Sequence, residues 1–180
     1  MKRCFPRLSI ILLAILSTYC SFSVASTVAV GNLPIPRQVG WVNDYAGMLT
    51  PAEREDLSMM LEQYQQETHH QIAVLTMTSI GSEAIEFFSL RTANAWGLGY
   101  RGLDNGILVT LAVKERKARI ELGRGMETYV SDADAADILA TALLPEVAKG
   151  NYYAGLKAGL MRLMDKARAF VVSAHALPHQ

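Results

Sequence analysis

Cysteine is nearly absent from this sequence. Its two cysteines, Cys4 and Cys20, both lie in an N-terminal stretch that has the pattern of an export leader. The expected mature chain therefore has no cysteine, which excludes disulfides, thiolate catalysis and cysteine-ligated metals from it.

A surplus of positive charge is also missing. The sequence has 17 basic and 17 acidic residues, and three of the basic ones, Lys2, Arg3 and Arg7, lie in the leader, which has no acidic residue. Removal of the leader would leave 14 basic against 17 acidic residues. Nucleic-acid binding, which depends on surplus Lys and Arg, is therefore disfavoured.

Long apolar runs are confined to the leader. A basic start precedes an apolar core over 8–16, and Ser23-Val24-Ala25 offers small residues at a cleavage site before Ser26. We predict a signal peptide over 1–25 and an exported protein, periplasmic or secreted. The core is short for a membrane span, and an uncleaved anchor is the alternative. No later run reaches 18 apolar residues, so we expect no transmembrane helix in the mature chain.

Apolar spacing predicts the regular elements of one domain over 41–172. Residues 26–40, with two prolines, read as an extended arm or linker, and 173–180 as a frayed tail. Thr50-Pro51-Ala52-Glu53 is a capping box that starts a helix, and Ser131 can cap another. The predicted helices run from Thr50 to near Thr68, over 83–96, from Ser131 to Leu144 and from Asn151 onward, and the predicted strands cover 72–78, 107–113 and 118–122.

This order predicts an α/β fold. A strand–helix–strand unit makes a right-handed parallel crossover, and 107–122 forms a hairpin around a charged turn at 114–117. Both parallel strands are almost wholly apolar, so both faces of the sheet should be covered. We therefore expect a three-layer α/β/α sandwich around a small mixed sheet with one parallel crossover and one hairpin.

The topology also places a glycine-rich loop. The loop over 97–106 holds four glycines with Asp104 and Asn105, and it leads directly into the second strand. It should lie at the same end of the sheet as the segment Glu121–Gly125 and the helix start at Ser131. Loops of this kind, held on a rigid scaffold, often carry binding sites. We therefore treat this end of the sheet as the candidate site.

The polar residues expected at this end suit a hard cation. Carboxylate, amide and backbone oxygens favour Ca²⁺ over Mg²⁺. The plainer alternative is that the aspartates stabilise a helix start and that Asp104-Asn105-Gly106 only turns the chain. Arg124, between two glycines, could contact an anion, although a plain surface arginine is the simpler interpretation. The residues converging here are Asp104, Asn105, Glu121, Asp132 and Asp134.

Other sequence features predict less. His69-His70 at a helix end is more simply a solvated pair than a metal site. No Gly-x-Ser-x-Gly or Asp-x-Asp-x-Thr pattern occurs, so the hydrolase mechanisms built on them lack support. No nucleophile can be identified, and enzymatic activity stays open.

The motifs of this chain carry a family resemblance. Several segments, in order and with ordinary spacing, resemble the TPM domain family over about residues 39–172. They are Val42–Thr50, Gln71–Leu75, Trp96–Leu108, Arg119–Gly125 and Gly150–Tyr152, with Gly155 and Gly159. The family includes exported bacterial proteins, a chloroplast photosystem II repair protein and a nematode acetylcholine-receptor modulator. The resemblance implies an α/β/α sandwich, which agrees with the fold predicted above from the order of strands and helices.

The resemblance also implies a function and adds a site residue. Some members bind calcium, some assist membrane complexes, and a plant member is credited with acid phosphatase activity. Asp44, Asp104, Asn105, Glu121 and Asp132 stand at the family's recurrent polar positions. We expect an exported module that binds a divalent cation, calcium before magnesium, and assists an envelope or membrane protein complex. The alternative is a metal-assisted acid phosphatase acting on phosphomonoesters.

Asp44 does not fit the predicted topology. The first helix should begin at the end of the sheet opposite the glycine loop. Either the chain before it runs back along the sheet, or Asp44 has a separate structural role.

Overall fold

A computed structural model describes residues 33–175, with side chains as far as residue 168. The predicted leader and its cleavage site lie outside the described residues. Four strands form one mixed sheet in the order β1-β2-β3-β4. They are β1 (Val42–Asp44), β2 (Gln71–Met77), β3 (Gly106–Ala112) and β4 (Lys117–Leu122). The first three are parallel, and β4 pairs antiparallel with β3.

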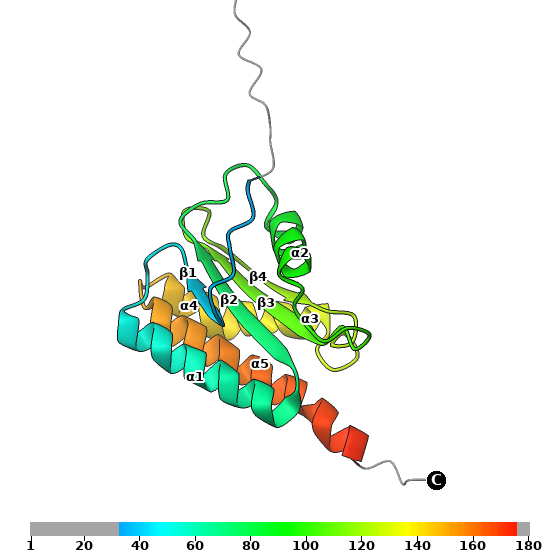
Figure 1. The fold of residues 1–180 in the computed structure, drawn as a ribbon. Coiled ribbons are helices and arrows are strands. Elements are labelled where there is room, and N and C mark those ends of the chain that lie inside the picture. The colour runs from blue at the N-terminus through cyan, green and yellow to red at the C-terminus, as the bar shows by residue number, and fades with distance from the viewer. Residues whose placement is uncertain (1–32, 176–180) are drawn as a thin grey trace, which may run out of the picture. The chain divides into compact units, whose positions relative to one another are not determined.

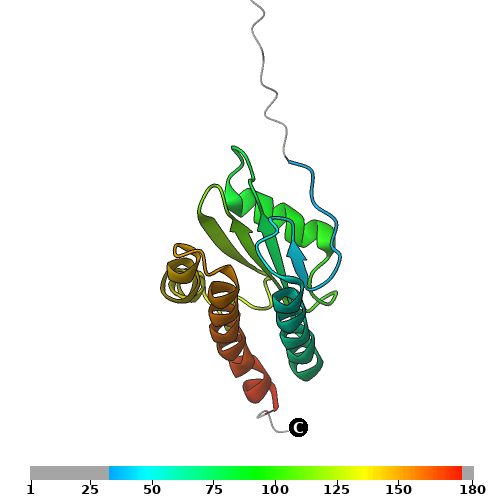
Figure 2. The same ribbon diagram turned by 90° about the vertical axis from the view of Figure 1, so that its left-hand side faces the viewer.

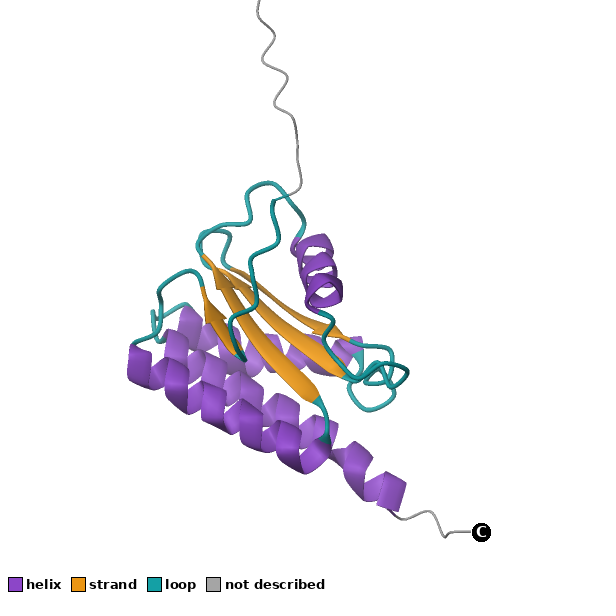
Figure 3. Cartoon of the chain, viewed as in Figure 1, coloured by secondary structure: helices purple, strands orange, loops and turns teal. Residues whose placement is uncertain are grey.

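Helices cover both faces of the sheet, as Figures 1 and 3 show. One face carries α2 (Ile85–Trp96), and the other carries α1 (Pro51–Thr68), α3 (Asp132–Ile138), the π-helical turn η1 (Leu139–Leu143), α4 (Leu144–Val147) and α5 (Tyr152–His175). This is the predicted three-layer sandwich. Among the described residues, no helix is long and apolar enough to cross a membrane.

The core divides into two parts because β3 is buried along its whole length. Its side chains alternate between the faces. Val109 joins Leu57 and Leu160 in the larger core under α1 and α5, and Leu108 joins Phe88 of α2 on the other face. Strands buried on both faces read as continuous apolar runs, and this is why the sequence pattern predicted the layers correctly.

The predicted helix starts are confirmed. The Thr50 hydroxyl accepts the Glu53 N–H at 3.3 Å, while the Glu53 carboxylate accepts the Thr50 N–H at 2.8 Å. Ser131 and Asp134 repeat the same reciprocal pair at the start of α3. These side chains satisfy N–H groups that have no partner inside their helices.

Three elements differ from the prediction. The segment at Val42–Asp44, expected only as an ordered lead-in, is the edge strand β1, too short to show a periodic signal. The third helix widens into η1 before Pro145, which has no N–H to donate to the preceding turn. Helix α5 runs to His175, past Ser173, where the sequence predicted fraying.

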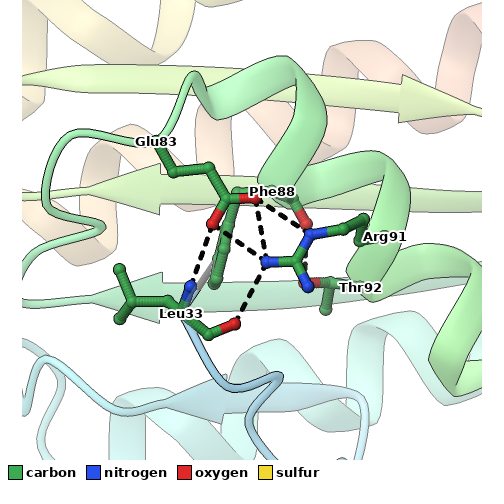
Figure 4. A network of polar contacts seen from close by, with 5 residues as sticks. All are labelled: Leu33, Glu83, Phe88, Arg91 and Thr92. Atoms are coloured by element: carbon green, nitrogen blue, oxygen red, sulfur yellow. Dashed lines mark hydrogen bonds and ion pairs between the residues drawn. The ribbon is translucent and has the colours of Figure 1, made fainter. Parts of the chain in front are cut away.

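The described part of the predicted arm, residues 33–40, is extended and held against α2. The Arg91 guanidinium pairs with the Glu83 carboxylate at 2.8 Å and donates to the Leu33 carbonyl at 3.0 Å, and the Leu33 N–H donates to Glu83 (Figure 4). The Trp96 indole N–H donates to the Pro36 carbonyl at 2.8 Å. This stretch is therefore a fixed part of the α2 layer.

Candidate functional site

The glycine loop and the segment after β4 meet at one end of the sheet, as the topology predicted. The Gly123 N–H donates to the Gly106 carbonyl at 2.8 Å, and the Gly125 N–H donates to the Asp104 carbonyl at 3.1 Å. A Cβ on Gly123 would lie 2.1 Å from the Asp104 oxygen, and one on Gly125 would lie 1.9 Å from the Leu103 oxygen. Only glycine allows two backbones to approach this closely.

Asn105 has a structural role in this loop. Its side chain is buried, and its amide nitrogen donates to the His69 carbonyl at 2.7 Å. Its amide oxygen accepts the Tyr100 N–H at 2.8 Å. The amide nitrogen thus joins the loop to the end of α1, and the amide oxygen closes a hydrogen bond within the loop. The side-chain oxygen that the sequence suggested as a metal ligand therefore already has a donor.

Glu121 and Asp132 do come together, but an arginine lies between them. The Arg119 guanidinium is 3.1 Å from the Glu121 carboxylate and 3.8 Å from the Asp132 carboxylate. The sequence analysis missed Arg119, although residues two apart on a strand share a face. The sequence predicted a bound cation between these two acids, but in the structure the Arg119 guanidinium supplies positive charge there.

Asp134 belongs to the same end of the molecule and is also paired. Its carboxylate lies 2.8 Å from the Lys166 ammonium and completes the capping box with Ser131. The hydrogen bonds from Lys166 and then Ser131 lower the pKa of Asp134 to about 2. This carboxylate stabilises the start of α3 and joins it to α5.

Asp44 lies at the other end of the sheet. It pairs in register with Thr76 on β2, whereas the glycine loop adjoins Gln71, five residues away along the same strand and roughly 16 Å distant. Its carboxylate accepts the N–H groups of Met48 and Leu49 and the Thr76 hydroxyl. Of the two alternatives for Asp44, the separate structural role is the one observed, and it cannot share one ion with Asp104.

Two residues at this edge keep exposed charges. Asp104 takes a left-handed backbone conformation with φ 48°, and its carboxylate has no hydrogen bond or ion pair among the described residues. Arg124 is exposed on the adjoining segment. Within residues 33–175, no group of three or more His, Asp, Glu or Cys side chains is arranged to hold a metal ion. The described side chains alone therefore fit a divalent cation poorly.

The histidine pair also differs from the prediction. His69 is exposed, but His70 is completely buried, with its Nδ1 atom 3.1 Å from the Tyr64 hydroxyl. Burial, and secondarily the nearby His69, lowers the pKa of His70, so its ring is neutral in the fold. The interpretation as a solvated pair is therefore wrong for His70.

Comparison with known proteins supports the resemblance drawn from the motifs. A family model described as the TPM domain matches residues 42–166. The N-terminal domain of a P. gingivalis protein, solved by NMR, is 30% identical, with 78% of this chain and 88% of that chain covered and a TM-score of 0.66. No protein of curated function matches the chain significantly.

Two more distant solution structures share the fold. BA42 from Bizionia argentinensis is 20% identical, with 68% of this chain and 83% of that chain covered and a TM-score of 0.58. The N-terminal domain of cg2496 from Corynebacterium glutamicum is 16% identical, with 76% and 87% covered and a TM-score of 0.57. With the match over residues 42–166 and the fold described above, the chain belongs to the TPM domain family.

Proposed function

We propose that this domain is a binding module of the cell envelope and that it contacts its partner through the glycine loop and the adjoining Gly123–Gly125 segment. The observation that carries the proposal is a loop that is held rigidly yet exposes apolar and charged groups together. Leu103 is 59% exposed and Tyr100 39%, beside exposed Arg101, Asp104 and Arg124. Tyrosine and arginine are enriched at protein interfaces, and a rigid loop loses little entropy on binding.

The export leader supports placing this module in the envelope. The pattern over 1–25 is that of a signal peptide, and the chain has few charges and no basic surplus. A membrane-associated protein of that compartment is the partner class we propose.

The partner surface can be tested by photo-crosslinking in cells. A photoreactive amino acid at Leu103 should give a discrete adduct with a membrane protein, and Arg124→Ala should weaken it. The matched control is the same amino acid at Glu55, which is exposed on α1 away from the loop. Equal adducts at both positions, or none at Leu103, would refute the proposal.

Calcium binding remains a second part of the proposal, with Asp104 as its centre. Among the acidic residues predicted as metal ligands, Asp104 has a carboxylate with no hydrogen bond or ion pair in the described part of the chain. Loop carbonyls can supply further oxygen ligands. With one unpaired acid we expect weak affinity, in the millimolar range typical of low-charge sites. Ca²⁺ titration should shift amide NMR signals of the loop, and Asp104→Asn should abolish the shifts while Asp137→Asn, on α3, should not.

The phosphatase alternative has less support in the described residues. Glu121 and Asp132 are paired with Arg119, and the Tyr100 hydroxyl accepts from Gln65 at 3.0 Å. The Ser131 hydroxyl does donate to Asp134 at 2.8 Å, but that carboxylate is already paired with Lys166 and caps α3, so it is poorly placed to act as a base. A phosphomonoester assay with and without Ca²⁺ or Mg²⁺ separates the two functions. Turnover that Asp104→Asn abolishes would favour the enzyme.

A further inference from the structure

A groove between α1 and α5 is lined by four methionines, two from each helix. It encloses about 590 Å³, and its methionines are Met59, Met60, Met161 and Met164. The two helices run side by side on the same face of the sheet, as Figure 2 shows. Residues 33–175 contain seven methionines and no cysteine, so thioethers are the soft ligands of this part of the chain, and most of them line one groove.

Two ion pairs set the two helices in register. Lys157 pairs with Asp56 at 2.9 Å, and Arg168 pairs with Glu67 at 2.9 Å. Each pair joins residues 101 apart in the sequence. The helices are therefore parallel, and their register stays constant over about three turns. By the same offset, Met60 lies level with Met161 across the groove.

The four methionines differ in how far they are buried. Met161 and Met164 are three residues apart on α5 and therefore share one side of that helix. Met164 is anchored in the core at 7% exposure, whereas Met161 is 50% and Met59 is 55% exposed. Core packing therefore accounts for Met164 but not for the two exposed side chains. Methionine has flexible rotamers that can bring an exposed sulfur toward a buried one.

The charge around the groove favours a cation. Lys157 and Arg168 line the groove, but each is neutralised by its acidic partner on α1. Asp165 also lines it, and its carboxylate has no ion pair or hydrogen bond among the described residues. The groove thus combines neutral, soft sulfur ligands with one uncompensated negative charge.

We propose that these four methionines form a binding site for a soft monovalent cation, Cu(I), with Ag(I) as its redox-stable analogue. Thioether sulfur selects Cu(I) over hard cations such as Ca²⁺, which prefer oxygen. The site is separate from the glycine loop, so it does not depend on the function proposed above. Binding would link α1 to α5 across the groove.

The proposal is tested by titrating Ag(I) into the protein labelled with ¹³C at the methionine methyl groups. The protein is expressed with its own leader and purified, in chloride-free buffer, in whichever form the cell produces, with the leader removed or retained. We expect saturable shifts at one equivalent for the four groove methyl signals. Met48, Met77 and Met126 are internal controls that should not move.

Matched variants complete the test. Met161→Leu keeps an apolar side chain of similar volume and should weaken Ag(I) binding at least tenfold, while Met77→Leu should leave it unchanged. Circular dichroism checks that both variants fold. Shifts that do not saturate, shifts at all methionines, or none at all would overturn the metal site.

Discussion

Gly125 shows how a single residue determines the geometry of the candidate site. Its Cα lies against the Leu103 carbonyl, and its N–H donates to Asp104, so the two segments touch backbone to backbone. A side chain there would separate the loop from the Gly123–Gly125 segment. The exposed groups proposed for partner binding depend on this contact, although Gly125 itself offers no functional group.

Gly125→Ala should therefore destabilise the domain. The new Cβ would lie 1.9 Å from a backbone oxygen that no rotamer change can move, so we expect a loss of about 2–3 kcal/mol in the free energy of unfolding. Urea unfolding measures it. Gly40→Ala is the control, since nothing lies within 4 Å of its added Cβ. Equal stability of the two variants would contradict this geometry.

At the scale of elements, the junction of α1 with β2 depends on a buried histidine. Helix α1 ends at Thr68, His69 turns the chain in the left-handed region at φ 59°, and His70 enters the core beside Tyr64. Burial also raises the pKa of Tyr64 to about 12, so both rings are neutral near neutral pH. The junction thus contains an ionisable group that the fold keeps uncharged.

Stability should consequently fall in mild acid. Since the pKa of His70 is lowered in the fold, the unfolded chain takes up the proton first as pH drops through about 6.5. The free energy of unfolding then decreases by at most about 1.4 kcal/mol per pH unit until the folded ring protonates as well. Denaturant unfolding between pH 7.5 and 5.5 measures this slope.

The slope can be assigned by matched variants. His70→Gln should flatten it because no titrating ring remains in the core. His69→Gln removes an exposed ring that lowers the pKa of His70 only secondarily to burial, so most of the slope should remain. An unchanged slope in His70→Gln would show that other groups cause the pH dependence.

At the scale of the whole molecule, one sheet joins two cores. Trp41 packs against the larger core under α1 and α5, and Trp96 packs against the smaller core under α2. Because β3 contributes to both cores, neither layer can lose its packing without exposing the other. The described domain should unfold as one cooperative unit.

The two tryptophans test this directly, since the sequence has only these two. Trp41→Phe leaves fluorescence that reports on the α2 layer, and Trp96→Phe leaves fluorescence that reports on the other. In each variant, the fluorescence and far-UV circular dichroism midpoints in urea should coincide. A fluorescence transition that precedes the loss of helix in either variant would mean that its layer unfolds separately.

Local chemistry made most of the fold predictable. Capping residues such as Thr50 and Ser131, and apolar runs such as that of β3, act within a few residues and leave a direct trace in the sequence. The three-residue strand β1 left none, because it is held by pairing with β2 and not by its own pattern. The π-helical turn was likewise not predictable. Pro145 indicated that the helix is interrupted, but not that the preceding turn becomes π-helical.

The sequence by itself determined the family, the layers and the end of the sheet where the glycine loop meets the Gly123–Gly125 segment. These follow from periodicity, handedness and glycine spacing, which are local or topological. Only the tertiary structure decided how the polar residues are paired. The contacts that decide this pairing join distant segments: Arg119 with Asp132, Asn105 with the end of α1, and Thr76 with Asp44 at the far end of the sheet. Pairing between distant segments depends on distance in space, which the spacing of residues along the chain does not encode.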